Sequence, residues 1–305
     1  AERMATEAEV RWAGRSTVAT AVEELKRRGA RGRTVGVIGP LGWREHAALA
    51  QVTGEVVDLG GAYTRLRLRK SEEELAWVRR GVQLTGQALA SLRDGARPGM
   101  SEAQLADLIE RAYVAEGATT HIHYLGATPM SAPELAAPAQ WHSRRRLQAG
   151  DALTCELSAS FWDHPGQVLR TFAVAADPTP LYVELHAIAE SAFQAVFERL
   201  RPGATAAELV AAAGLIDAAG FTIRDDLVHG FVGGYLPPVL GTPGRQLEPV
   251  PEFTFAAGMT VVVQPNVVTL DERAGVQFGE LVLVGEAGAQ RLHAPASGLA
   301  RIGDG

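Results

Sequence analysis

The feature that most constrains the fold of this chain is a long internal repeat. Arg97–Leu105 (RPGMSEAQL) matches Arg201–Leu209 (RPGATAAEL), so the second copy begins 104 residues after the first. Each copy leads into a predicted helix that ends at a glycine, and later into an apolar strand that opens with glycine, at 150–157 and 258–265. A period this long does not suit a solenoid of short stacked units. It predicts two similar halves whose strands meet in one central sheet, with any site at their junction.

The repeat lies within residues 65–305, which we expect to form an α+β domain. Ser71 and Glu74 have the spacing of a capping box, and the apolar positions after them predict a long helix. Residues 1–64 are predicted to be a separate, partial α/β domain. Its helices are expected at 16–28 and 45–51, and its two short β-branched strands at 34–38 and 55–59.

Composition excludes several classes of protein. The chain has 29 Lys and Arg against 35 Asp and Glu, a net charge of −6, so a nucleic-acid partner held by a global basic field is not expected. The single cysteine, Cys155, excludes an internal disulfide framework and a cysteine-cluster zinc site. No apolar run reaches the length of a membrane span, and no signal peptide is visible. We therefore expect a cytoplasmic protein with no membrane partner. Because the chain begins at Ala1 without an initiator Met, we expect it to begin inside a longer protein.

Several short segments of the second domain occur in a characteristic order. They are Lys70–Glu74, Leu147–Asp151, Arg170–Phe172, His229-Gly230, Gly258-Met259, Gln264-Pro265 and Gly275-Val276. Together they resemble the pita-bread superfamily of methionine aminopeptidase, prolidase, aminopeptidase P and creatinase. The resemblance covers the chain from Lys70 to its end and implies a pita-bread fold with a pseudo-twofold repeat. By the same resemblance, residues 1–64 look like the C-terminal half of the N-terminal domain of prolidases and creatinases.

The metallopeptidases of this superfamily hold two divalent metals with two Asp, one His and two Glu. The resemblance places these five ligand positions at Glu156, Gln167, His229, Gln264 and Gly279. One carboxylate cannot balance two divalent cations, so we expect no metal and no other cofactor. A one-residue slip would recover Glu280 but would turn its side chain to the other face of the strand. A single weak metal on Glu156, His229 and Glu280 stays open as an alternative.

Creatinase is the precedent for this fold working without metal, because it cleaves a C–N bond of a small guanidino substrate by proton transfer through a histidine. Ungapped counting places that histidine at Ala139, and a three-residue deletion would bring His142 into its place. The arginines at 144–146 favour the neutral form of His142 that a base needs. The carboxylate that creatinase carries before the strand arginine is Leu169 here, which argues against creatine as the substrate.

The resemblance therefore implies a metal-independent hydrolase of a C–N bond in a small molecule, and a homodimer. We expect three catalytic residues and four substrate-binding residues: His229, Glu156 and His142, and Gln167, Gln264, Glu280 and His123. His121 and His123 lie on one extended segment, and one of them should face the cleft. The alternatives are a non-catalytic pita-bread binding protein, an atypical Xaa-Pro metallopeptidase, and a lyase or cyclase on the same fold. In the first of these, His229 would be a buried, hydrogen-bonded turn residue, His142 a solvated loop residue, and the two glutamines would only fill a former metal cavity.

Overall fold

The computed structural model describes residues 11–246, 248–294 and 298–304. The chain divides into two compact units, Ala1–Arg67 and Leu68–Gly305. In the first unit, two parallel strands, β1 (Thr34–Val37) and β2 (Glu55–Asp58), pair from Thr34 opposite Glu55. Helices α1 (Thr17–Arg27) and α2 (Trp43–Ala50) accompany them, and α3 (Gly60–Leu68) leads the chain onward. The two strands, α1 and α2 are the α/β elements that the sequence predicts, within two residues at each end, whereas α3 is not predicted.

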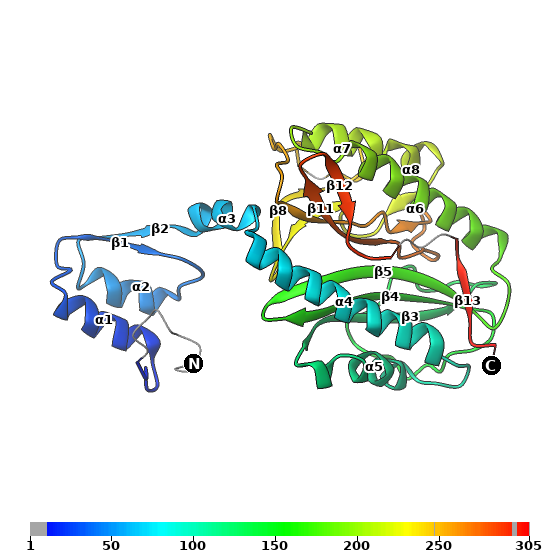
Figure 1. Cartoon of the computed structure of the whole chain (residues 1–305), viewed down its shortest axis with the longest axis horizontal. Coiled ribbons are helices and arrows are strands. Elements are labelled where there is room, and N and C mark those ends of the chain that lie inside the picture. The colour runs from blue at the N-terminus through cyan, green and yellow to red at the C-terminus, as the bar shows by residue number, and fades with distance from the viewer. Residues whose placement is uncertain (1–10, 247, 295–297, 305) are drawn as a thin grey trace. The chain divides into compact units, whose positions relative to one another are not determined.

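The second unit is built on one nine-stranded sheet, which runs β3-β4-β5-β11-β9-β7-β8, with β12 on β11 and β13 on β5 (Figure 1). Its long strands are β3 (Thr119–Pro129), β4 (Asp151–Phe161), β5 (His164–Val174), β7 (Val228–Phe231), β8 (Tyr235–Leu240), β9 (Thr260–Val263) and β11 (Gly279–Gly285). The short ones are β12 (Gly288–Arg291) and β13 (Ala300–Ile302), and a separate pair joins β6 (Thr222–Ile223) to β10 (Val267–Val268).

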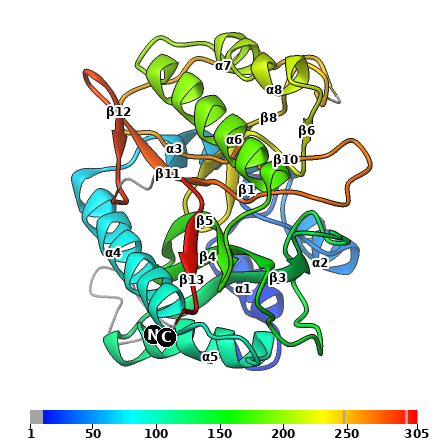
Figure 2. The same cartoon turned by 90° about the vertical axis from the view of Figure 1, so that its right-hand side faces the viewer.

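Each half of the sheet has its own helices and its own core. Helices α4 (Glu72–Gly95) and α5 (Glu102–Arg111) pack with β3, β4 and β5, and α6 (Pro180–Arg199), α7 (Ala206–Ala212) and α8 (Gly214–Ala218) with the other half (Figures 1 and 2). A one-turn 3-10 helix, Val114–Glu116, follows α5. Among the described residues, no helix is both long and apolar enough to cross a bilayer.

The two repeat copies fold alike, which confirms the predicted α+β pita-bread class with its pseudo-twofold repeat. Gly99 and Gly203 both have positive φ, of 93° and 88°, a backbone region that glycine enters without steric cost. Their amides donate to the carbonyls of Leu147 at 2.7 Å and Phe255 at 2.9 Å. Each turn then enters a helix through a capping box, Ser101 with Gln104 in the first copy and Thr205 with Glu208 in the second.

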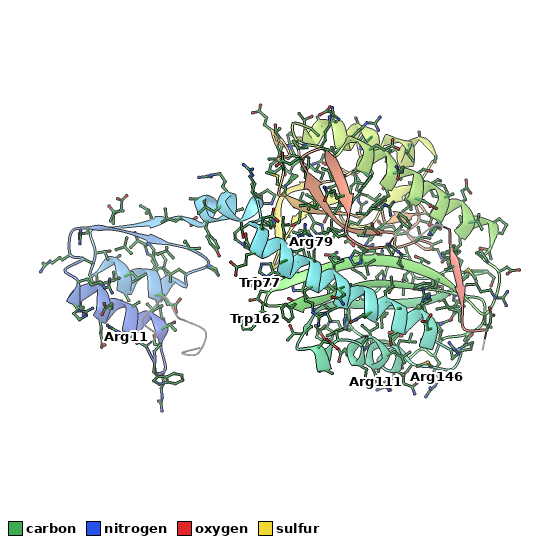
Figure 3. The ribbon with its side chains drawn as sticks, in the orientation of Figure 1. Arg11, Trp77, Arg79, Arg111, Arg146 and Trp162 are labelled. Carbon is green, nitrogen blue, oxygen red and sulfur yellow. The ribbon has the colours of Figure 1, made fainter. Side chains whose placement is uncertain are left out.

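The register of β4 against β5 is set by the tight turn that joins them. Trp162 and Asp163 form its two central residues, with φ of 50° and 60°, as a two-residue hairpin loop of the primed type requires. Trp77 of α4 packs edge-on against His164, with ring centroids 5.1 Å apart (Figure 3). From this turn, the register runs unbroken to Ser158 opposite Gln167 and Glu156 opposite Leu169.

Strand alternation gives the sheet two distinct faces. The front face carries the side chains of Glu156, Gln167 and His229, and the back face carries those of Arg170 and Glu280. Cys155 also points to the back, where it is fully buried in the core beneath α4, as its strand position predicts.

Candidate functional site

The front-face site centres on Glu156 of β4 and Gln167 of β5. The amide nitrogen Nε2 of Gln167 donates to Glu156 Oε1 at 2.7 Å. Glu156 is 8% exposed and Gln167 is fully buried. The Oε1 atom of Gln167 is buried with no partner among the described residues, so this amide keeps one acceptor free at the site.

A chain of hydrogen bonds continues from Gln167 to the second half of the sheet. Gln167 Nε2 lies 3.3 Å from Gln264 Oε1, and Gln264 Nε2 lies 3.3 Å from Asp226 Oδ1. The same Asp226 oxygen accepts from Nδ1 of His229 at 2.8 Å. Four of the seven predicted site residues, Glu156, Gln167, Gln264 and His229, therefore belong to one connected polar group that also includes Asp226.

The hydrogen bond to Asp226 fixes which nitrogen of His229 carries the proton. A carboxylate oxygen accepts, so Nδ1 donates, and Nε2 keeps its lone pair in the neutral ring. His229 is fully buried, and its Nε2 atom has no partner among the described residues. This leaves a buried, oriented imidazole nitrogen that can accept a proton.

Aromatic rings enclose His229. Tyr235 of β8 stacks on it with ring centroids 3.8 Å apart and an interplanar angle of 18°, and Phe231 packs edge-on at 5.6 Å. His121 packs on the other side of Phe231, with centroids 5.7 Å apart. Burial, and then the Asp226 carboxylate, raise the pKa of Tyr235, so its hydroxyl stays protonated at neutral pH.

The site stabilises the protonated form of its central acid. Burial raises the pKa of Glu156 to about 8, and the nearby carboxylates of Asp225 and Asp226 add to the rise. Burial also raises the pKa of Asp225, whose φ of 64° lies in the left-handed region that non-glycine residues seldom adopt. At neutral pH, Glu156 therefore holds a proton that it can donate, and the unpartnered Nε2 atom of His229 belongs to the same polar group.

An open cavity of about 710 Å³ adjoins this group. Asp226 and Tyr235, which contact His229 directly, line it together with Asp225 and two arginines, Arg224 and Arg245. Both arginines pair with Glu272. The cavity thus carries both signs of charge and one aromatic wall, next to the polar group.

Three of the predicted site residues lie elsewhere. Glu280 points to the back face, where its carboxylate pairs with Arg170 at 2.6 Å and Arg291 at 3.3 Å. The alternation of β11 explains this, because the front-facing neighbour is Gly279. His142 is exposed on the loop before β4.

His123 is also on the back face, 3.1 Å from the hydroxyl of Tyr113, and its pKa is lowered to about 4, chiefly by burial. Strict alternation would put His121 and His123 on one face. A bulge between Thr120 and Ile122 separates them, so the histidine that reaches the site's aromatic cluster is His121.

The residues present do not fit a pair of divalent cations. Glu156 is the one carboxylate among the five positions, its bond partner is an amide hydrogen donor, and Gly279 has no side chain. An added Cβ at Gly279 would lie 2.4 Å from the Val263 carbonyl and 2.7 Å from Gln264 Cα. Within the described part of the chain, no three His, Cys, Asp or Glu side chains are grouped to hold a metal ion.

Two residues of the site do not follow from the sequence reasoning. Asp226 orients His229 and joins it to Gln264, and Tyr235 covers the imidazole ring. The available signal for Asp226 is an acidic pair at 225–226, three residues before the histidine, where a loop enters a short buried strand. The contact of Tyr235 with His229 can be inferred only once β8 is known to pair with β7.

Comparison with known proteins gives consistent matches. The sequence model of metallopeptidase family M24 matches residues 76–286. The "Probable dipeptidase PepE" of Mycobacterium tuberculosis is 28% identical over 231 residues, which cover 74% of this chain and 58% of that protein. The chain thus spans little more than half the length of this relative.

Solved structures share the fold. Dipeptidase PepE from Mycobacterium ulcerans superposes with a TM-score of 0.78 at 23% identity, covering 95% of this chain and 76% of that one. Prolidase from Pyrococcus furiosus gives a TM-score of 0.76 at 21% identity, covering 90% and 80%.

Proposed function

The chain belongs to metallopeptidase family M24, and we propose that it is a creatinase- or prolidase-like hydrolase that cleaves a C–N bond in a small molecule without a metal ion. The observation that carries the proposal is the hydrogen-bonded chain from Glu156 to His229. It ends in a buried proton donor on one side and an unpartnered imidazole nitrogen on the other.

These two groups are suited to opposite halves of a hydrolysis. His229 Nε2 takes a proton from water as the water oxygen bonds to the substrate carbon, with Asp226 holding the ring in place. The Glu156 carboxyl gives its proton to the substrate nitrogen as the C–N bond breaks, and the proton held by His229 restores Glu156. Positioned acid–base groups of this kind contribute about 10²- to 10⁴-fold each to a rate.

The substrate class follows from the adjoining cavity. Its lining presents carboxylates at Asp225 and Asp226 beside guanidinium groups at Arg224 and Arg245. A zwitterionic small molecule such as a dipeptide or an N-substituted amino acid would find both signs of charge there. The cavity volume of about 710 Å³ lies within the usual range for small-molecule sites.

The test is turnover under metal-free conditions. Protein treated with a chelator is incubated with a panel of Xaa-Pro dipeptides and small ureido acids, and amine release is followed by NMR. We expect turnover that falls about 10²-fold or more in both His229→Ala and Asp226→Asn. The matched control is Glu110→Gln, which alters the contact between a carboxylate and His123 on the back face and should leave turnover within about 3-fold. Equal turnover in all four proteins would refute this site.

A second candidate is a metal-dependent dipeptidase, which the names of the relatives favour. Turnover of Xaa-Pro dipeptides only after addition of manganese or cobalt would support it over the metal-independent hydrolase. If no substrate turns over under either condition, a binding role for the same cavity would replace both enzymatic proposals.

We also propose a cytoplasmic homodimer, as the family resemblance implies. Sedimentation equilibrium of the chain tests the assembly. A single species with twice the 32.3 kDa mass of the chain is expected, and a monomer at micromolar concentration would contradict it.

A further inference from the structure

A second cavity lies on the back face of the same sheet. It has a volume of about 430 Å³ and lies between β5, the second half of α4, α6 and four residues from the C-terminal part of the chain, His293, Ala294, Gly298 and Ala300. Leu89, Val168 and Phe172 form part of its apolar wall, and Arg170, His186 and His293 its polar side. The proposed hydrolase does not use it, because Val168 and Arg170 point away from Glu156 and Gln167.

A glycine keeps this cavity open. Gly86 lines it from the middle of α4, where glycine costs about 1 kcal/mol relative to alanine. An ideal Cβ built on Gly86 would meet no atom within 4 Å. By contrast, Gly81 on the same helix is required by packing, since its Cβ would lie 2.1 Å from the His164 carbonyl. Packing within the described chain therefore does not account for Gly86, and a side chain there would enter the cavity.

Two buried polar atoms from this lining have no partner among the described residues. They are Nε of Arg170, on a residue 6% exposed, and Nε2 of His293, on a residue 8% exposed. Buried donors and acceptors without partners are uncommon and costly. The guanidinium Nε is a donor. The imidazole of His293 donates to the backbone of Gln167, so its Nε2 is the acceptor in the neutral ring, and burial lowers the pKa of His293 to about 3, which keeps it neutral.

The charge around the cavity favours an anion. Arg170 and Arg291 share the carboxylate of Glu280, whose side chain is 1% exposed, so these three groups together carry one positive charge. The partly exposed carboxylate of Glu190 lies at the edge of the lining, 3.8 Å from His186 and 3.3 Å from the Gly298 amide, away from the free Nε of Arg170 in the hydrogen-bond pattern. Arg93 adds a further guanidinium to the lining, although its own partner is Asp94. A carboxylate suits the positive side, and a hydroxyl or amino hydrogen suits the free acceptor of His293.

From these contacts, we propose that the back-face cavity binds a small organic acid with a short apolar body and a hydroxyl or amino group beside its carboxylate. The carboxylate accepts from Arg170, the neighbouring hydroxyl or amino group donates to His293, and the apolar body lies against Leu89 and Phe172. The site is distinct from the front cavity, with which it shares no lining residue.

The test uses 2-hydroxy-3-methylbutyrate and L-valine as probes and 3-methylbutyrate as the analogue that lacks the donor. Calorimetry at pH 7 is expected to show binding of at least one probe, and about 10-fold weaker binding of the analogue, since it leaves the His293 acceptor unpaired. Gly86→Leu should abolish binding by filling the cavity, whereas Gly86→Ala should retain it within about 3-fold. His293→Asn keeps a donor for the Gln167 backbone, but its shorter side chain places no acceptor at the position of Nε2, so probe and analogue should bind alike.

Thermal unfolding verifies that each variant is folded, and the His293→Asn result stands if Gly86→Leu does not fold. Glu156→Gln, at the front site, should bind the probes like the natural chain. The inference is overturned if neither probe binds, if binding survives in Gly86→Leu, or if Glu156→Gln loses it.

Discussion

Replacing Glu156 by glutamine should reveal a large hidden cost of ionising this acid. Glu156 is 8% exposed, and burial beside Asp225 and Asp226 raises its pKa from the ordinary 4.5 to about 8. Between these values the folded chain keeps a proton that the unfolded chain has lost. The unfolded state then binds fewer protons, so the free energy of unfolding falls as pH rises from 4.5 to 8. Glutamine has the shape of the protonated acid and does not titrate.

The size of the effect follows from the span of the two pKa values. At 1.36 kcal/mol per pH unit, a span from 4.5 to about 8 amounts to about 5 kcal/mol as an upper limit. The difference in unfolding free energy between Glu156→Gln and the natural chain should therefore be smallest near pH 4.5. It should grow in favour of the variant by about 1 kcal/mol per pH unit up to pH 8, and then level off.

The assay is urea unfolding followed by tryptophan fluorescence, in chelator, at each pH unit from 5 to 9. Glu208→Gln is the control, because hydrogen bonds to Thr205 lower the pKa of this exposed acid and its charge is then constant over that range. Its difference from the natural chain should not vary with pH. A flat profile for Glu156→Gln would refute the buried, protonated acid. A variant less stable than the natural chain at pH 8 would do so too, because a metal-bound or ion-paired Glu156 is stabilised as the anion.

Three further substitutions test the framework by urea unfolding at pH 7. Arg170→Leu should lower the free energy of unfolding by about 3–5 kcal/mol, because it removes the shorter of the two ion pairs of the Glu280 carboxylate, which is 1% exposed. The control is Arg301→Leu, which removes a side chain that is 42% exposed and should lower it by less than about 1 kcal/mol. Equal losses in the two variants would contradict the argument. Ser71→Ala should cost about 1 kcal/mol by removing the side-chain cap of α4, and no change would show that the cap is replaced by water. Gly279→Ala should cost about 1–3 kcal/mol, because its Cβ would lie 2.4 Å from the Val263 carbonyl, and a stability gain would mean that the strands part without strain.

Local sequence patterns predict much of this fold because the two halves repeat the same short-range interactions. The capping boxes at Ser101 and Thr205, and the glycine turns before them, need only a few neighbouring residues. Strand alternation likewise predicts that Glu156 and Cys155 point to opposite faces. The family register then brings Gln167, Gln264 and His229 to the face of Glu156, although these residues lie far apart in the chain.

The features that were missed depend on irregular backbone or distant pairing. A bulge near residue 121 places His121 and His123 on opposite faces of the sheet, and strand alternation alone cannot predict such a bulge. Glu280 lies on the back face because β11 alternates, and what the sequence did not predict is that arginines from β5 and β12 pair with it there. Asp226 acts on His229 at a spacing of three residues, but its contact with Gln264 requires β7 and β9 to be paired.

The close approach at Gly279 also limits which side chains position 279 can carry. With 2.4 Å to the Val263 carbonyl and 2.7 Å to Gln264 Cα, the backbone of the next strand occupies the space that any side chain at 279 would need. A glutamate introduced there could not reach the site until β9 and β11 moved apart, and Gln264, which directly follows β9, would move with that strand. Any substitution path that adds a carboxylate at position 279 therefore passes through less stable intermediates. The order of the substitutions on such a path matters. The residues around position 264 have to repack before a carboxylate is introduced at position 279.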